Sequence, residues 1–394
     1  MQYSDDTCDI FCTVVDNYGD IGVSWRLARQ LANEHGVYVR LWVDDLASFA
    51  RLCPKADVML DAQHQHGVEV RRWPAEFPPV EPAALVIEAF ACRLPPRYVA
   101  AMDDRDKQPV WVNLEYLSAE DWVDGCHKLP SPHPTLHLTK YFFFPGFTEK
   151  TGGLLLERDL LVRRDAFQSD EVVQMEFWNN LGVPERVTDE LRVSLFSYEN
   201  EAMAELLHVW EHGAQLITCL VPEGRALPQI KEYFGGDVLC RLDFSPTGLV
   251  GPKSGPHYSC GNLHVYVLPF VEQEEYDRLL WACDINFVRG EDSCVRAQWA
   301  ARPFVWHIYP QHDGVHLAKL EALRAHYAAG LPADAAAAVH AMWMAWNGGT
   351  EIGAAWLNLL TQRQVLGQHG KDWAQRLSSN NLALNLLDFS RRLA

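Results

Sequence analysis

The chain has 394 residues, which exceeds the usual size of a single hydrophobic core and favours two domains. Its hydrophobic share of 48% and charged share of 22% are typical of soluble globular proteins, and no apolar run reaches the roughly 18 residues of a membrane span. The formal net charge of −18 disfavours direct binding of nucleic acid. Because the N-terminus also lacks the pattern of a signal peptide, we expect a cytoplasmic protein without direct membrane or nucleic-acid contacts.

Short apolar runs rich in β-branched residues alternate with helix-length amphipathic segments along the first part of the chain. This alternation is typical of parallel α/β sheets. A helical segment at 24–36 lies between the first two strand candidates. The expected strands cover 10–15, 37–43, 68–73, 84–90 and 109–117.

A second alternating series begins after the pattern weakens around 151–165. Its expected strands cover 191–198, 214–221, 263–270, 284–288 and 303–309. From Pro332 the sequence is helical, and we expect its last helix to pack back on the first domain. The predicted organisation has a first domain at 1–155 joined by the helix at 375–394, a linker at 156–184 and a second domain at 185–374.

The predicted fold class is therefore α/β, with two Rossmann-like domains that face a cleft. Ligands of such folds bind beyond the carboxyl ends of the strands, so the strand-to-helix loops are the place to search for function. The sequence contains neither GxGxxG after a strand nor GxxxxGK[ST], which argues against a dehydrogenase or a P-loop kinase.

Two carboxylates, Asp16 and Asp20, bracket a glycine turn after the first strand and precede an amphipathic helix. One interpretation is catalytic, because both side chains belong to a cleft loop. The other is helix N-capping, which is a common use of Asp at such a position. The residues alone leave both interpretations open.

A second motif, Arg289-Gly290-Glu291-Asp292-Ser293, ends a strand and opens a helix that carries Arg296. A helix N-terminus and arginines attract a diphosphate, while carboxylates accept hydrogen bonds from sugar hydroxyls. The combination suits a nucleotide sugar, although a capping motif with surface ion pairs remains the alternative.

Further candidates follow other expected strands. Aromatic side chains there offer a surface on which a flat base stacks, but aromatic residues at strand ends more often complete a core. Glu115 and Tyr116 form a polar strand end in the first domain, for which an ordinary loop role is equally available. The candidates in the second domain are Phe196, Tyr198, Phe270, Gln273, Tyr276 and Asp277.

No metal site is expected. The ten cysteines are scattered and form no CxxC pair, which disfavours both a disulfide framework and structural zinc. His312 and His316 have helical i, i+4 spacing, but no HExxH motif or cysteine partner accompanies them.

Six separated segments, in this order, resemble the bacterial protein-arginine rhamnosyltransferases that modify translation elongation factor P. The resemblance spans nearly the whole chain and is more specific than any single motif. The segments are 16–31, 86–95, 113–120, 151–159, 268–277 and 289–311.

The resemblance implies an inverting, metal-independent glycosyltransferase of the GT-B type, which uses dTDP-β-L-rhamnose and one arginine of elongation factor P and needs no cofactor. It further implies that Asp20 is the general base, assisted by Asp16, and that Glu115 and Tyr116 lie on the acceptor side. The donor site implied by it comprises Phe196, Tyr198, Phe270, Gln273, Asp277, Arg289, Gly290, Glu291, Asp292 and Ser293.

Two alternatives remain, and the first belongs to another class of function. One is a noncatalytic adaptor that binds a translation factor and keeps the nucleotide site as a regulator. The other is a glycosyltransferase with a different donor or acceptor. The presence of both aspartates beside an intact RGEDS motif disfavours the adaptor.

Overall fold

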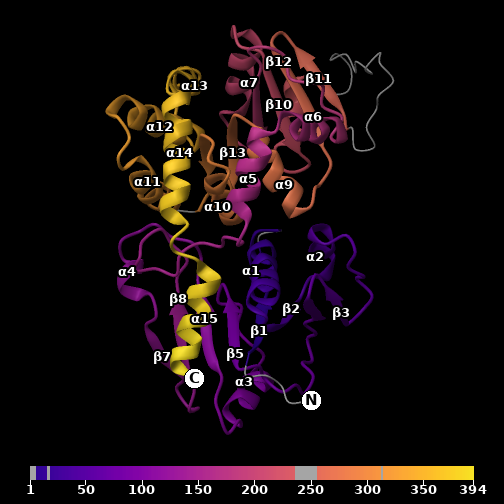
Figure 1. Ribbon diagram of the computed structural model, residues 1–394, viewed down its shortest axis with the longest axis vertical. Coiled ribbons are helices and arrows are strands. Elements are labelled where there is room, and N and C mark those ends of the chain that lie inside the picture. The colour runs from indigo at the N-terminus through magenta and orange to yellow at the C-terminus, as the bar shows by residue number, and fades with distance from the viewer. Residues whose placement is uncertain (1–5, 16–17, 236–254, 312–313) are drawn as a thin grey trace. The chain divides into compact units, whose positions relative to one another are not determined.

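The structure is a computed structural model that describes residues 6–15, 18–235, 255–311 and 314–394. It divides into two compact units, Met1–Arg158 with Leu377–Ala394 (unit 1) and Asp159–Arg376 (unit 2) (Figure 1). Within the described residues, no helix is long and apolar enough to cross a membrane.

Unit 1 contains a sheet of eight strands in the order β3-β4-β2-β1-β5-β6-β8-β7. Its six inner strands are parallel. When they are numbered by their position in the chain, their order across the sheet is 3-2-1-4-5-6, as in dinucleotide-binding folds. The strands are β1 (Thr7–Cys12), β2 (Tyr38–Val43), β3 (Ala62–Gln65), β4 (Val68–Arg72), β5 (Leu85–Ala89), β6 (Val110–Leu114), β7 (Pro130–Pro132) and β8 (Thr139–Phe143).

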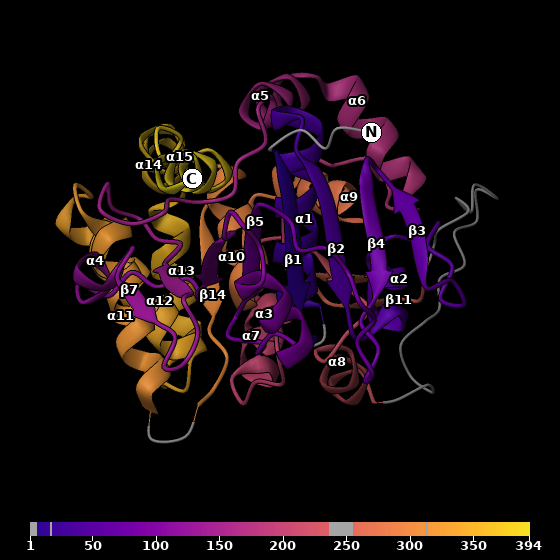
Figure 2. The same cartoon turned by 90° about the horizontal axis from the view of Figure 1, so that it is seen from below.

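Helices cover both faces of this sheet, because its central strands are apolar on both sides. The last helix of the chain belongs to this unit, and Figure 2 shows it on the opposite side of the strands from α3. Phe389 of that helix packs on the Tyr141 ring at 5.3 Å. The helices are α1 (Gly19–His35), α2 (Leu46–Leu52), α3 (Pro96–Asp103), α4 (Val123–Cys126) and α15 (Leu382–Leu393).

A buried polar cluster lies between β1, β2 and α3. Asp9 is fully buried and pairs with Arg40 at 2.6 Å. The Tyr98 hydroxyl also donates a hydrogen bond to Asp9. Burial and the charge of Asp9 raise the pKa of Tyr98, so the phenol keeps its proton.

Unit 2 contains a sheet in the order β11-β12-β10-β9-β13-β14. When its five parallel strands are numbered by their position in the chain, their order across the sheet is 3-2-1-4-5. Both units are therefore Rossmann-like, and the predicted fold class is confirmed. The strands are β9 (Leu191–Leu195), β10 (Ile217–Pro222), β11 (His257–Cys260), β12 (Leu263–Leu268), β13 (Ile285–Arg289) and β14 (Phe304–His307).

The helices of unit 2 also cover both faces of its sheet. On one face Trp210 packs against Trp356, with 5.2 Å between ring centroids, and Phe287 of β13 packs on Trp346 at 4.9 Å. The helices are α5 (Leu160–Ser169), α6 (Glu171–Asn180), α7 (Met203–His212), α8 (Leu227–Tyr233), α9 (Gln273–Ala282), α10 (Gly290–Trp299), α11 (Val315–Ala328), α12 (Ala333–Trp346), α13 (Ile352–Thr361) and α14 (Arg363–Leu377).

The segment 156–184, expected as a linker, contains α5 and α6. The α5 side chains bind unit 2: Arg164 donates to the carbonyl of Trp299 at 2.9 Å, and Gln168 donates to that of Ala300 at 3.0 Å. Asp170 caps α6 by accepting hydrogen bonds from the N–H groups of Val172 and Val173. From Asp159 onward this segment is therefore part of unit 2.

Candidate functional site

An arginine–aromatic cluster lies at the carboxyl ends of β9 and β13. The guanidinium carbon of Arg289, the last residue of β13, lies 4.4 Å from the centre of the Phe196 ring and 4.8 Å from that of Tyr198. Both aromatic residues follow β9, which pairs in parallel with β13. Between these two strands the strand order reverses, and that is where open α/β sheets bind ligands.

The start of α10 is built around Gly290. This residue has a φ of +61°, and a Cβ placed on it meets the Tyr198 hydroxyl at 3.4 Å, so glycine suits both the backbone and the space. The Ser293 hydroxyl accepts a hydrogen bond from the Arg289 N–H at 3.1 Å, while Trp306 donates to the Gly290 carbonyl at 2.9 Å. The first turn, which carries Glu291 and Asp292, is thereby fixed.

The residues predicted on α9 lie beside this cluster. Gln273 opens the helix and is buried, and the ring of Tyr276 contacts Phe196 at 5.6 Å between centroids. Asp277 accepts two hydrogen bonds from Arg296 of α10, at 2.8 and 2.6 Å. Phe270 lies half-buried in the loop between β12 and α9.

Three further residues contact the cluster and were absent from the predicted site; one of them is Tyr309, whose ring centroid lies 5.3 Å from that of Tyr198. The Arg225 guanidinium carbon lies 5.9 Å from the Tyr198 ring centre. Arg225 follows β10, so it lies in a strand-to-helix loop, and this position could have identified it as a candidate from the sequence. The His307 ring lies 5.4 Å from that of Tyr198, and burial, followed by the charge of Arg289, lowers the pKa of His307 to about 4.

In unit 1 Asp20 is the second residue of α1 and is 4% exposed. Its carboxylate accepts a hydrogen bond from the N–H of Val15 at 3.1 Å. The N-cap residue is Tyr18, which caps through no side-chain hydrogen bond, so Asp20 is not the N-cap. The other candidate, Asp16, lies outside the described residues.

Glu115 and Tyr116 follow β6. The side-chain amide of Asn113 donates to the Glu115 carboxylate. The Tyr116 ring stacks on Phe90 with 4.7 Å between centroids and remains 39% exposed. A carboxylate next to an exposed aromatic face is an arrangement that attracts a cation such as a guanidinium.

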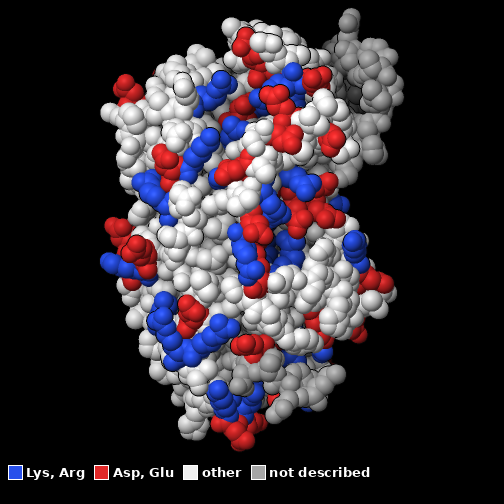
Figure 3. All heavy atoms as spheres, in the orientation of Figure 1, with Lys and Arg blue, Asp and Glu red and all other residues white. Residues whose placement is uncertain are grey.

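The histidine pair with helical spacing is described only in part. His312 lies outside the described residues, and the His316 imidazole accepts a hydrogen bond from the Gln311 N–H at 3.1 Å. Acidic and basic side chains are interspersed over most of the face shown in Figure 3. The absence of a metal from the reaction stays a prediction.

The comparisons with known proteins agree with one another. The sequence model of a family described as Elongation-Factor P (EF-P) rhamnosyltransferase EarP matches residues 8–391. Protein-arginine rhamnosyltransferase of Pseudomonas putida is 51% identical over 98% of both chains, and that of Pseudomonas aeruginosa is 49% identical over 97% of this chain and 98% of its own.

A solved structure described as the structural basis for EarP-mediated arginine glycosylation of translation elongation factor EF-P is also similar. It is 38% identical, superposes with a TM-score of 0.68, and the match covers 98% of this chain and 99% of that one. The chain therefore belongs to the EarP family, and it is an enzyme of the protein-arginine rhamnosyltransferase class.

Proposed function

We propose that this enzyme transfers L-rhamnose from dTDP-β-L-rhamnose to an arginine side chain of elongation factor P, with inversion at the sugar carbon and without a metal ion. The single observation that carries the donor assignment is the stacking of Arg289 over Phe196 and Tyr198 at the switch point of unit 2. The acceptor assignment rests on membership of the family.

Unit 2 binds the donor in this proposal. Arg289 and the N-terminus of α10 supply positive charge to the diphosphate, and this charge counts most when the bond to the sugar breaks. Phe196, Tyr198, Phe270 and Gln273 contact the nucleotide. Glu291 and Asp292 repel a bare phosphate, so we assign them to hydroxyl groups of the sugar or the ribose.

Asp277 and Ser293 support this site. Asp277 accepts hydrogen bonds from Arg296 and so holds α9 against α10. It does not contact the donor in this proposal but positions the start of α10, which does. Ser293 fixes the backbone of Arg289 through the hydrogen bond that its hydroxyl accepts. Gly290 leaves room for Tyr198 beside the diphosphate.

Unit 1 binds the acceptor arginine. The guanidinium is held by the Glu115 carboxylate and the exposed face of Tyr116, and Asp20 takes its proton. Asp16 assists in this proposal. Removing a proton from a guanidinium of pKa about 13 at neutral pH costs about 8 kcal/mol, so a free neutral guanidine is a poor description of the nucleophile.

The proton therefore leaves as the new bond forms, when the nitrogen becomes more acidic. The guanidinium nitrogen attacks the anomeric carbon, the bond between that carbon and the diphosphate oxygen breaks, and Asp20 accepts the proton. The products are dTDP and an α-linked rhamnosyl arginine, because one in-line displacement inverts the β configuration. General-base catalysis of this kind contributes about 10²- to 10⁴-fold.

Intact-mass analysis of elongation factor P tests this proposal. After incubation with the enzyme and dTDP-β-L-rhamnose in the presence of a chelator, we expect a mass gain of one deoxyhexose, located on an arginine by fragmentation. The anomeric configuration of the product, read by NMR, should be α. Transfer that requires magnesium, or that occurs only with another nucleotide sugar, contradicts the proposal.

A further inference from the structure

Three metal-binding side chains meet at the C-terminal end of α7, outside the donor site. His208, Glu211 and His212 each offer one ligand atom, and these atoms lie within 4.8 Å of one another. The i, i+4 spacing of the two histidines places both imidazoles on one face of the helix, with ring centroids 4.1 Å apart. Both histidines are exposed, so an ion from solvent reaches them.

The tautomer of His212 leaves the right atom for a metal. Its Nδ1 lies 3.1 Å from the carbonyl oxygen of His208, which only accepts hydrogen bonds, so Nδ1 carries the proton. The lone pair of the neutral ring is then on Nε2, which lies 3.7 Å from the Glu211 carboxylate. The Nε2 lone pair and the carboxylate oxygen are both metal-ligand atoms, and their separation is close to that of two ligands on one ion.

The Glu211 carboxylate is held in place by two neighbours. The Tyr233 hydroxyl donates to one oxygen, and the Cys260 thiol donates to the other at 3.1 Å. The Tyr233 hydrogen bond is the largest cause of the lowered pKa of Glu211. Each oxygen keeps a further lone pair, so the oriented and charged carboxylate can still bind a metal ion.

We propose that His208, Glu211 and His212 form a binding site for a divalent transition metal such as Zn²⁺. Zinc binds imidazole nitrogen and carboxylate oxygen at about 2.0–2.2 Å in a tetrahedral geometry, so ligand atoms on one ion lie about 3.3–3.6 Å apart. The observed spacing reaches this range through small side-chain rotations. A water molecule completes the four-coordinate ion.

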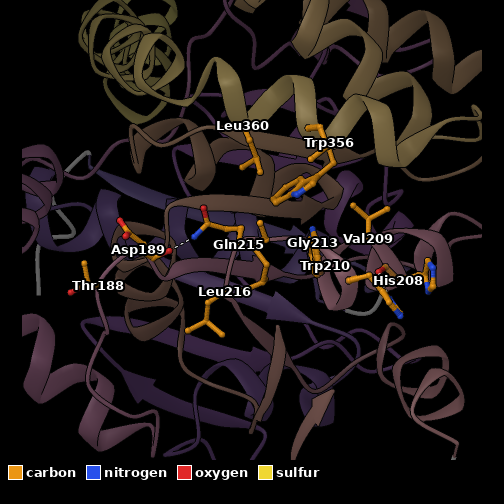
Figure 4. A pocket seen from close by; sticks show the side chains of 14 residues that line it. Thr188, Asp189, His208, Val209, Trp210, Gly213, Gln215, Leu216, Trp356 and Leu360 are labelled. Atoms are coloured by element: carbon orange, nitrogen blue, oxygen red, sulfur yellow. Dashed lines mark hydrogen bonds between the residues drawn. The ribbon is translucent and has the colours of Figure 1, made fainter. Parts of the chain in front are cut away.

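The site lies at the end of unit 2 opposite the donor cluster. The two histidines line the mouth of a pocket of about 690 Å³ that also contains Trp210, Gln215 and Trp356, at the amino ends of β9 and β10 (Figure 4). The hairpin between β11 and β12 packs on the same helix end, where the Asn262 N–H donates to the Glu211 carbonyl at 3.0 Å. The ion therefore stabilises the packing of the β11–β12 hairpin on the C-terminal end of α7, and it takes no part in the transfer of the sugar.

Calorimetric titration of Zn²⁺ into the chelator-treated full-length chain tests the site. We expect one ion to bind, and His208→Gln and His212→Gln each to weaken binding. Tyr233→Phe, which removes only a partner of Glu211, should weaken it by about tenfold. Because the metal binds the folded chain, Zn²⁺ should raise the melting temperature of the native protein but not that of the His212→Gln variant.

His340→Gln is the matched control, since His340 lies 3.9 Å from Glu321 on an exposed surface but has no second histidine beside it in the described contacts. It should bind Zn²⁺ like the native chain. Equal binding by the native chain and both histidine variants contradicts the site. So does binding that survives these variants and is lost in Cys260→Ser, because the ion then sits on thiols.

Discussion

The guanidinium of Arg296 and the carboxylate of Asp277 form a two-point ion pair inside unit 2, with N–O distances of 2.8 and 2.6 Å and exposed side-chain fractions of 1% and 4%. The pair joins α9 to α10, whose first turn carries the proposed diphosphate site. A buried charge left without its partner is much more costly than an exposed one.

Asp277→Asn should therefore lower the free energy of unfolding of unit 2 by about 3–5 kcal/mol, because it removes the carboxylate charge that accepts two hydrogen bonds from the buried guanidinium of Arg296. Urea unfolding followed by tryptophan fluorescence measures the loss. The double variant Asp277→Asn with Arg296→Gln should recover part of it. Glu321→Gln is the control: Glu321 pairs with Arg324 on α11, and their side chains are 49% and 19% exposed, so the loss should be under about 1 kcal/mol. Equal losses in the two single variants contradict the argument.

Gly290→Ala should weaken dTDP binding, since a Cβ at this position meets the Tyr198 hydroxyl at 3.4 Å and forces a left-handed backbone on alanine. Calorimetric titration of dTDP measures the effect. Gly235→Ala is the matched control, because its φ is +81° and no atom of the described residues lies within 4 Å of its Cβ. It should lose stability by about 1 kcal/mol and keep its dTDP affinity. A Gly290→Ala variant with native affinity contradicts the placement of the diphosphate at the start of α10.

Arg289→Ala should weaken dTDP binding in chelator-containing buffer, because it removes both the charge near the diphosphate and the cation above Phe196 and Tyr198. Arg289→Lys should restore part of the affinity, since lysine keeps the charge and loses the planar stacking. Arg324→Ala, on α11, serves as a control that removes one half-buried positive charge. If the native chain binds dTDP only with magnesium, the assignment of the diphosphate to Arg289 is wrong.

Acidification should destabilise unit 2 through His307. Burial lowers its pKa from 6.5 to about 4 in the folded chain, so the unfolded chain takes up a proton between these values that the folded chain does not. Stability is then fully present above pH 6.5 and falls toward pH 4, with a slope of up to about 1.4 kcal/mol per pH unit. His307→Asn should flatten this slope when urea unfolding is measured at pH 7.5 and pH 5. An unchanged slope would show that His307 is already protonated when folded.

Much of the fold was predictable because its central strands are continuous apolar runs. The expected strand at 37–43 matches β2, and that at 284–288 matches β13 within one residue. The three antiparallel edge strands were missed, because short edge strands such as Ala62–Gln65 are polar and lack the apolar signal. The inner parallel strand β8 was missed as well. The first strand was placed about three residues too late, since apolar residues continue past its end at Cys12.

The candidate site was predictable to the extent that its residues follow strands. Arg289, Phe196 and Tyr198 stand at strand ends on neighbouring strands, so their meeting follows from the strand order. The pairing of Asp277 with Arg296 did not follow, because it depends on which faces α9 and α10 turn to each other. His208 and His212 were likewise not recognised, although their helical spacing is in the sequence.

The proposed reaction rests most directly on Asp20. Asp20→Asn keeps the side-chain shape and the oxygen that accepts the Val15 N–H but removes the base. The affinity for dTDP should therefore stay native, because we assign the donor to unit 2, whereas a transition-state role predicts loss of the chemical step. Thermal melting of the same variant checks that the fold is intact.

Single-turnover transfer of rhamnose to elongation factor P by Asp20→Asn, with enzyme in excess over acceptor, is the decisive measurement. We predict a rate at least about 10²-fold below that of the native enzyme, the lower end of what a general base contributes. A purely structural carboxylate predicts nearly native turnover with some loss of stability. A variant that is folded, binds dTDP normally and still transfers rhamnose at a substantial fraction of the native rate contradicts the general-base assignment of Asp20.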